Sequence, residues 1–385
     1  MSELQLMVLV VAVIYLWECG VWLRRGAVAF RMDARGRWRL HHPATALGNP
    51  AGGLVLAPPL PPLGYLIPAT QSPLSVGPDG VFAYVAQCLN PGWRPPQSGR
   101  WLPFTDVRDL TVSGRRLRVG KLTLVTTNSL YQADSLAAQL RELAALPATR
   151  REQALAATLR AAFDTAAIQA RWQTFAPLAR PLRNSCNLLW CYLFLLAPAA
   201  IWRFGFLRTW LPVLLVLLAF TITNTVLFHR AHRRLYPMEE DDRLTQDCLI
   251  LLAPASSARA HDTLARHLFT GFHPLAVAQV LLSPEDFTAF ARRVVLELRH
   301  PIPPVCPESA PPAAIATEAS ARAALLGAVT NFLQAQKINV PDLTRPPERA
   351  EPACLTYCPR CESQFTTPDG TCPDCNSLPL AKFPG

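Results

Sequence analysis

The sequence predicts a multi-pass membrane protein with an α+β cytoplasmic domain, a transmembrane helical hairpin, a small helical domain and a C-terminal metal-binding module. Three observations predict this fold class. Half of the 385 residues are hydrophobic and many of them lie in long apolar runs, basic residues flank these runs, and the last cysteines form two Cys-x-x-Cys pairs. The 37 prolines favour several short elements over one large regular domain.

Residues 4–23 predict the first transmembrane helix. This run is long enough to cross a bilayer and carries one charge, Glu18. Six arginines follow it within residues 24–39, whereas a cleaved signal peptide carries its basic residues before the apolar run. We therefore expect a retained anchor, with the N-terminus outside and the chain from Arg24 onward in the cytoplasm.

Residues 187–228 predict a transmembrane hairpin made of two apolar segments, 187–202 and 210–228. Arginines precede the first segment and follow the second, which places both ends on the cytoplasmic side of a bacterial-type inner (cytoplasmic) membrane. Between Arg24 and Arg183 the chain has 20 basic and 8 acidic residues, and positive-inside topology explains this excess without nucleic acid. The alternative is a buried helical pair in a soluble domain.

Residues 27–146 predict a β-rich cytoplasmic domain closed by a helix, followed by a juxtamembrane helical segment at residues 149–183. Short alternating runs are broken by Gly and Pro, most clearly in "DLTVSGRRLRVGKLTLV". Strand hairpins closed by a helix resemble the pleckstrin-homology type of domain found in some bacterial membrane proteins. The resemblance implies contact with anionic lipid headgroups through four residues, Arg115, Arg116, Arg118 and Lys121. The alternative is that the basic face of these strands is simply solvated.

Residues 237–300 predict a helical cytoplasmic unit. Adjacent carboxylates at residues 239–242 open it, and they are typical of a solvated cluster because they lack the alternation of a calcium loop. The spacing of its histidines does not support a metal enzyme, because two imidazoles that share a zinc on one helix stand at i and i+4, whereas His261 and His267 stand six residues apart. An enzyme site within residues 256–300 would use the polar side chains of His261, Asp262, His267 and His273.

Residues 301–355 predict a Pro-rich linker with one short helix, around Leu325, Val329 and Phe332. Prolines, arginines and glutamates follow this helix. We therefore expect the C-terminal module to be flexibly tethered.

Residues 356–385 carry the most specific pattern in the chain. Two Cys-Pro-x-Cys turns with ten residues between them are formed by Cys358, Cys361, Cys372 and Cys375. The segment resembles the small zinc ribbons, in which two such turns hold a structural Zn²⁺ by four thiolates. It departs from them at Glu362 and Asn376, where many ribbons have Gly. Disulfides and iron are the alternatives, and a reducing cytoplasm and the small module favour zinc.

The sequence contains no evident catalytic constellation, and four protein ligands leave a metal no open position for a substrate. We therefore expect a membrane-anchored cytoplasmic binding or scaffolding protein whose zinc ribbon contacts a protein partner. One alternative is a membrane-tethered nucleic-acid binder that acts through the ribbon, but residues 354–385 carry only two basic against three acidic residues. The other is the enzyme within residues 256–300. The sequence leaves the oligomeric state open.

Overall fold

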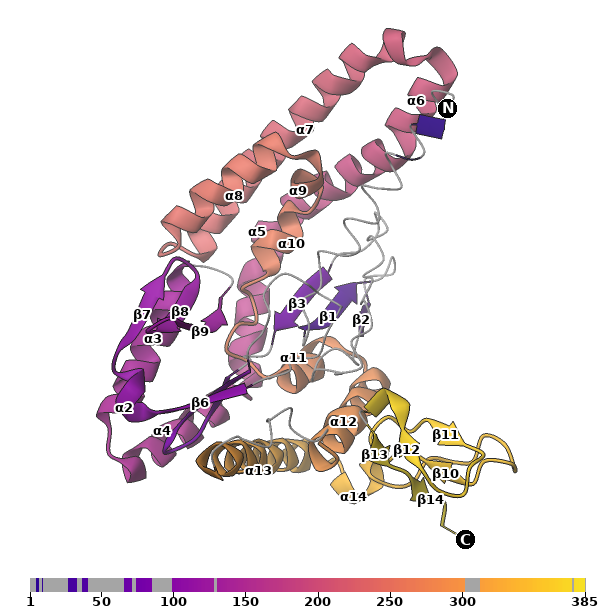
Figure 1. Cartoon of the computed structure of the whole chain (residues 1–385). Helices are drawn as coiled ribbons and strands as arrows, with labels where there is room; N and C mark the ends of the chain where they lie inside the picture. The colour runs from indigo at the N-terminus through magenta and orange to yellow at the C-terminus, as the bar shows by residue number, and fades with distance from the viewer. Residues whose placement is uncertain are drawn as a thin grey trace.

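The computed structural model of the chain describes residues 5–6, 9, 27–32, 37–40, 66–70, 74–84, 99–127, 130–301, 312–375 and 377–384. This described part is mostly helical, with two long apolar helices and several small antiparallel sheets, two of them in a small C-terminal β region (Figure 1). The predicted first transmembrane helix, residues 4–23, lies outside the described residues except at Gln5, Leu6 and Leu9.

Two long helices form the hairpin that rises from the body of the molecule in Figure 1. The first runs through α5 (Thr165–Cys191), a π-helical stretch (Tyr192–Leu196) and α6 (Ala197–Phe204), and the second is α7 (Phe206–Leu235). Gly205 joins them with a φ of 81°, a left-handed conformation that glycine adopts at little steric cost. By length and composition, both helices are able to cross a membrane.

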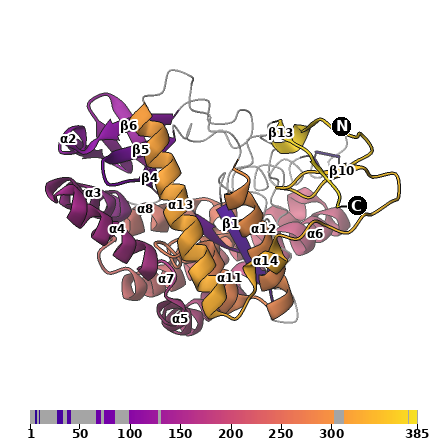
Figure 2. The same ribbon diagram turned by 90° about the horizontal axis from the view of Figure 1, so that it is seen from below.

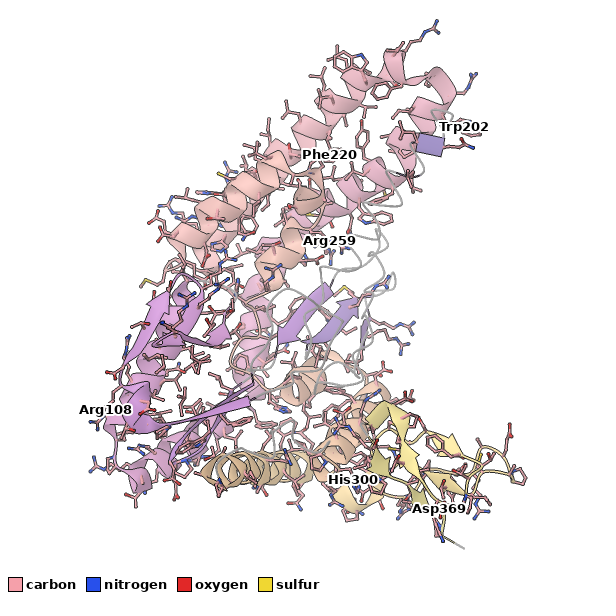
Figure 3. The ribbon with its side chains drawn as sticks, viewed as in Figure 1. Arg108, Trp202, Phe220, Arg259, His300 and Asp369 are labelled. Carbon is pink, nitrogen blue, oxygen red and sulfur yellow. The ribbon has the colours of Figure 1, made fainter. Side chains whose placement is uncertain are left out.

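The hairpin changes character along its length. Near the body, α5 buries Ile168, Phe175 and Leu182 in a helical core. Toward the tip the apolar side chains face outward, and Trp202 and Leu207 are 74% and 83% exposed (Figure 3). The core helix of a soluble domain would bury such side chains, so the outer part of the hairpin has the apolar surface expected of a membrane segment.

Six strands and two helices enclose a separate core. The strands form two antiparallel three-stranded sheets, each in sequence order. Leu117 and Leu124 are buried in one cluster with Leu140 of the closing helix. The elements are β4 (Leu74–Val76), β5 (Gly80–Tyr84), β6 (Gly99–Pro103), α2 (Phe104–Val107), β7 (Leu110–Ser113), β8 (Arg116–Val119), β9 (Leu122–Thr126) and α3 (Leu130–Ala145).

A third sheet has the strand order β2-β1-β3 and packs elsewhere. Val28 and Phe30 are fully buried in the helical core around α5, not in the core of the other six strands. Residues 27–146 therefore contribute to two cores. The sequence predicts a β-rich domain here and leaves open whether residues 27–183 form one domain or two. Alternation identifies the buried face of a strand, but it does not identify what covers that face. The strands are β1 (Ala27–Met32), β2 (Trp38–Leu40) and β3 (Leu66–Thr70).

The helical core joins the base of the hairpin to residues 240–299. Phe175 of α5 and Phe228 of α7 share it with Phe290. The predicted helical unit at residues 237–300 is thus packed on the hairpin base. A further helix, α4 (Ala148–Ala161), leads into α5. The helices that follow the hairpin are α8 (Glu240–Leu252), α9 (Pro254–Ala258), α10 (Ala260–Ala265), α11 (Pro274–Leu281) and α12 (Pro284–Arg299).

A long helix, α13 (Pro312–Ala335), crosses the underside of the molecule (Figure 2). At one end it packs against β4 and β5, where Trp101 donates a hydrogen bond from Nε1 to Oγ1 of Thr317 at 3.1 Å. At the other end Val329 and Leu333 are buried in the helical core. The sequence predicts only a short helix in a flexible linker here, but the structure has a 24-residue helix that connects two cores.

The C-terminal region is a small β unit that lies against α12 (Figure 1). A turn of helix, α14 (Val340–Leu343), precedes it. Three of its strands form a sheet in the order β11-β10-β14, and the other two pair as β12-β13. The elements are β10 (Thr356–Tyr357), β11 (Gln364–Phe365), β12 (Thr371–Cys372), a 3₁₀ turn (Pro373–Cys375), β13 (Leu378–Pro379) and β14 (Ala381–Lys382).

Candidate functional site

Four cysteine side chains meet at the centre of the C-terminal region. Their sulfur atoms all lie within 4.8 Å of one another. Three of the cysteines are buried, and Cys361 is partly exposed. Within the part of the chain that the structure describes, this is the only group of His, Cys, Asp and Glu side chains arranged to hold a metal ion. The four are Cys358, Cys361, Cys372 and Cys375.

The donor set fits zinc. A Zn–S bond of about 2.3 Å gives a tetrahedral S···S edge of about 3.8 Å, and the sulfurs of Cys361 and Cys372 are 3.7 Å apart. The same sulfurs are too far apart for a disulfide, whose bond is about 2.05 Å long. The cluster and its small β region are therefore consistent with a zinc ribbon. Four thiolates would close the coordination shell and supply structural rather than catalytic chemistry.

The thiols differ in acidity before any metal binds. A hydrogen bond from Cys358 lowers the pKa of the Cys361 thiol and raises the pKa of Cys358 itself. Burial raises the pKa of Cys375 to about 12. Binding of zinc by all four sulfurs must therefore release protons, so the affinity for the metal rises with pH.

The turn after the first cysteine pair is built without glycine. Glu362 has a φ of 62°, in the left-handed region that side chains rarely adopt. Its main-chain N–H donates to the carbonyl of Cys358, and the N–H of Cys358 donates to the carbonyl of Ser363, both at 2.9 Å. Ser377 has the same φ after the second pair. Asn376, the other departure from the ribbon pattern, lies outside the described residues.

Two side chains of the first cysteine turn fasten the ribbon to α12. Arg360 is buried and donates from Nη1 to the main-chain carbonyls of Glu297 and His300, at 3.0 Å each. These carbonyls lie at the C-terminal end of α12, where the helix dipole favours a cation (Figure 3). Arg292 of α12 donates from Nε and Nη2 to the carboxylate of Glu362. Glu362, the residue in the left-handed conformation, is therefore paired with Arg292.

The ribbon is packed against α12, whereas the Pro-rich stretch before the ribbon predicts a flexible tether. The carboxylate of Glu297 is buried and lies 3.8 Å from Arg360. Burial raises the pKa of Glu297, while the charges of Arg360 and Arg293 act in the opposite direction. A proline-rich composition predicts how a chain segment behaves by itself, and it contains no information about such a contact across 63 residues.

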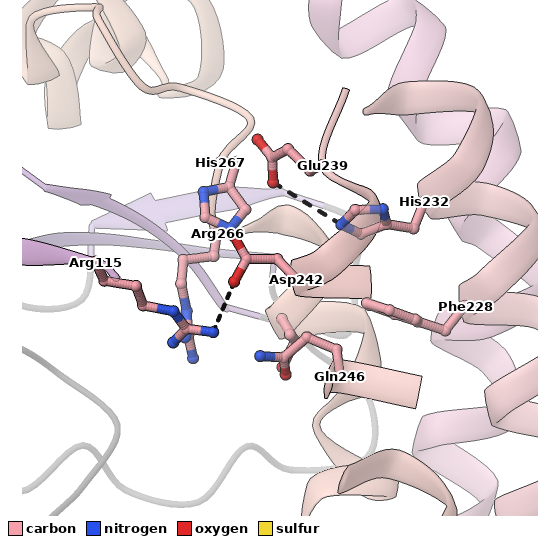
Figure 4. A pocket seen from close by; sticks show the side chains of 9 residues that line it. Arg115, Phe228, His232, Glu239, Asp242, Gln246, Arg266 and His267 are labelled. Atoms are coloured by element: carbon pink, nitrogen blue, oxygen red, sulfur yellow. Dashed lines mark hydrogen bonds and ion pairs between the residues drawn. The ribbon is translucent and has the colours of Figure 1, made fainter. Parts of the chain in front are cut away.

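A small polar pocket lies where the six-strand domain meets the base of the hairpin (Figure 4). Arg115, in the β7–β8 turn, forms an ion pair with Asp242 of α8 at 2.8 Å. The other carboxylate oxygen of Asp242 accepts a hydrogen bond from the main-chain N–H of Leu130, the first residue of α3. The pocket measures about 10 Å³, enough for about one water molecule but not for an organic substrate.

The acidic cluster at residues 239–242 is only partly solvated. Glu239 and Asp242 are buried, whereas the sequence predicts a solvated row of carboxylates. Burial, together with the nearby charge of Asp242, raises the pKa of Glu239 to about 7. Its carboxylate lies 4.0 Å from Nε2 of His232. The carboxylate of Asp242 therefore connects α8 with the six-strand domain, and Glu239 lines the same pocket.

The four basic residues that were predicted to touch lipid headgroups have different surroundings. Arg115 belongs to the ion pair with Asp242. Arg116 and Lys121 are exposed, and Arg118 is partly buried. Lipid contact therefore stays a prediction for Arg116, Arg118 and Lys121, while Arg115 already has a partner within the chain.

The candidate catalytic histidines are not brought together. His273 is buried, caps α11 by accepting from the N–H of Leu275, and stacks on Phe163. His261 is buried and lies beside Asp262, which pairs with Arg259 at 3.2 Å. His267 lines the polar pocket, and its Nδ1 lies 2.6 Å from Nε2 of Gln132.

Comparison of the chain with protein-family models, with curated proteins and with solved structures found no match. The four-cysteine cluster remains the feature with the most specific chemistry.

Sequence reasoning missed the polar contacts that connect the parts. Arg360 carried a usable signal, because it is the only arginine in residues 356–385 and lies between two metal ligands. The polar run at residues 221–225, by contrast, predicts hydrogen bonds between helices, because a polar side chain inside an apolar segment needs a partner. The structure provides that partner on α9: Nδ2 of Asn224 donates to the hydroxyl and the carbonyl of Ser257, at 3.1 Å each.

Proposed function

We propose that this chain is a membrane-anchored binding or scaffolding protein. The hairpin anchors it in a bacterial-type inner membrane, and the remaining units lie on the cytoplasmic side. The observation that carries the proposal is the attachment of the four-cysteine ribbon to α12. Arg360 and Glu362 fix the ribbon to α12, and α12 shares a core with the base of the apolar hairpin.

The charge distribution supports this orientation. Arg230, Arg233 and Arg234 are exposed at the base of α7, immediately after the apolar segment 210–228. Arg180 is exposed on α5 before the segment 187–202. Basic residues at both ends of a hairpin favour the cytoplasmic side for both ends, and a reducing cytoplasm keeps metal-binding thiols free of disulfides.

The free surface of the ribbon suits a protein partner. Leu355, which pairs with β11 through its main-chain N–H, is 45% exposed. The loop at residues 366–370 is also exposed and is made of small and polar side chains with Asp369. An exposed leucine beside polar loop residues fits a modest protein interface with an apolar centre and a polar rim.

The alternatives have weaker support. Nucleic-acid binding by the ribbon would need basic side chains that are free to contact phosphates. Arg360 instead donates to carbonyls at the end of α12, and Lys382 is the remaining basic residue of the ribbon. An enzyme would need converging groups, but His261 and His273 serve separate structural contacts.

Chemical cross-linking in native membranes tests the proposal. The parent chain is compared with Leu355→Asp, which changes the free surface and leaves all four cysteines in place, and with Cys358→Ser/Cys361→Ser, which removes two metal ligands. Zinc is measured in all three proteins. Lys382→Ala serves as the surface control, because this exposed side chain lies on the same ribbon.

We expect one defined protein to be cross-linked to the parent and to the Lys382 variant, and to be lost from both other variants, although Leu355→Asp keeps its zinc. A set of cross-linked proteins that is identical for all four chains would contradict a binding role for the ribbon.

A further inference from the structure

The turn between α8 and α9 is unusually apolar for a segment outside the predicted hairpin. Residues 244–258 contain one charged side chain, Asp247. This carboxylate lies 2.7 Å from Nδ1 of His229 on α7. The one charged side chain of the segment is therefore paired with the hairpin. We call residues 248–258 the α8–α9 corner.

Hydrocarbon side chains cover the outside of this corner. Leu252 is 80% exposed, and Leu249 and Leu251 are 47% and 39% exposed. Ile250, between them, is buried in the helical core. Three exposed leucines on four consecutive positions form an apolar patch that water would disfavour.

The depth of the corner follows from its contacts with the hairpin. α8 lies beside α7 and runs back toward the hairpin tip (Figure 1). His229, the partner of Asp247, is one residue beyond the predicted segment 210–228. Leu252 is five residues further along α8, which is about 7.5 Å at 1.5 Å per residue. Leu252 therefore lies beyond the predicted membrane boundary, on the hydrocarbon side.

A second set of contacts places the corner at the same end of the hairpin. Ser257 of the corner accepts hydrogen bonds from Asn224, which is inside the predicted segment 210–228. The carbonyl of Ser257 also lies 3.4 Å from Sγ of Cys186, immediately before the segment 187–202. Figure 1 shows α9 between α5 and α7. The corner thus packs between α5 and α7 at the cytoplasmic end of the hairpin.

We propose that the α8–α9 corner dips into the cytoplasmic leaflet and contacts lipid directly, as a re-entrant third part of the membrane-embedded surface. This inference rests on the proposed membrane location of the hairpin. Lipid is the favoured occupant because the corner is bonded to the hairpin through Asn224, and because Leu188 and Val226, at the same end of the hairpin, are exposed apolar side chains too. A depth of about 7.5 Å is also typical of interfacial helices, which enter the boundary region by about 5–10 Å.

Site-specific photo-cross-linking tests the inference. A benzophenone amino acid replaces, in separate full-length proteins, Leu252, Leu244 and Leu215. Leu244 is the matched control, since it is exposed on the same helix and lies about 12 Å closer to the cytoplasm. Leu215, exposed within the predicted segment 210–228 of α7, reports whether the hairpin itself is in lipid. Phospholipid adducts are measured by mass spectrometry after irradiation of native membranes.

We expect phospholipid adducts at positions 215 and 252, and several-fold less at position 244. Adducts at 215 with none at 252, or a cross-link from 252 to a second copy of the chain or to another protein, would overturn the inference and leave the membrane anchor in place. No adduct at 215 or 252 would overturn both.

Discussion

The four cysteines of the candidate metal site come from two Cys-x-x-Cys turns. A Cys-x-x-Cys turn is local, so its spacing already fixes the positions of two sulfurs, and two such turns require only one chain reversal to form a tetrahedron. Cys354 is buried but is not part of the four-sulfur cluster. We therefore expect substitution of a cluster cysteine and substitution of Cys354 to have different effects on metal binding.

Cys372→Ser should remove zinc from the protein, whereas Cys354→Ser should retain about one zinc per chain. Loss of a ligand removes a binding free energy that is on the order of 10 kcal/mol for structural zinc and is coupled to folding of the ribbon. Metal analysis of the purified proteins checks this. Equal zinc content in the two variants would show that the cluster is not the metal site.

Glu239 illustrates a residue that the sequence misplaces. Four adjacent acidic side chains suggest solvation, but the tertiary fold buries two of them, Glu239 and Asp242, in a pocket that Arg115 of the six-strand domain also lines. The raised pKa of Glu239 has a thermodynamic consequence. The folded protein keeps this proton up to about pH 7, whereas the unfolded chain loses it near pH 4.5, so the group destabilises the fold increasingly as the pH rises through that range.

Glu239→Gln should therefore be more thermostable than the parent at pH 8 and no more stable at pH 4.5, because glutamine resembles the protonated acid. Thermal unfolding at a series of pH values measures the difference. Asp241→Asn, an exposed neighbour, should show no such trend. A difference between Glu239→Gln and the parent that does not change with pH would contradict the account.

At the scale of elements, the docking of the ribbon depends on Arg360. Arg360→Ala should open the contact with α12, because it removes the donor to two helix-end carbonyls and leaves the buried carboxylate of Glu297 with Arg293 as its charged partner, at a cost of about 1–3 kcal/mol. Hydrogen exchange should rise at residues 296–300 and at the ribbon surface, while zinc is retained. Lys382→Ala is the control, and unchanged exchange in the Arg360 variant would show that the ribbon is held by other contacts.

The elements themselves could be predicted where one feature is sufficient. Long apolar runs predict the two helices of the hairpin, and the cysteine spacing predicts the small β region. The length of α13 and the place of β1 could not be predicted, because both depend on partners far away in the sequence. Thr317 bonds Trp101 across 216 residues, and Phe30 is buried against helices that begin more than a hundred residues later.

At the scale of the whole molecule, two cores are joined by α13 and by the polar junction around Asp242. The junction explains why one turn of the six-strand domain lies at the base of the hairpin. Asp242 binds the β7–β8 turn through Arg115 and the start of α3 through the N–H of Leu130. Its carboxylate is therefore a single point at which both elements contact α8.

Arg115→Ala should destabilise the protein by about 1–3 kcal/mol, because the carboxylate of Asp242 stays buried after its charged partner is removed. Arg116→Ala, in the next position and exposed, should change the stability by less than about 0.5 kcal/mol. Denaturant unfolding in detergent measures both. Equal effects would indicate that the ion pair does not connect the two parts.

Cysteine labelling in intact cells tests how the molecule is oriented in the membrane, on which the proposed function depends. A membrane-impermeant maleimide is applied to Arg208→Cys, near the hairpin tip, and to Asp369→Cys, in an exposed loop of the ribbon (Figure 3). The parent chain gives the background. We predict labelling at position 208 in intact cells and at position 369 only after permeabilisation. Labelling of position 369 in intact cells, or protection of position 208, would contradict the account.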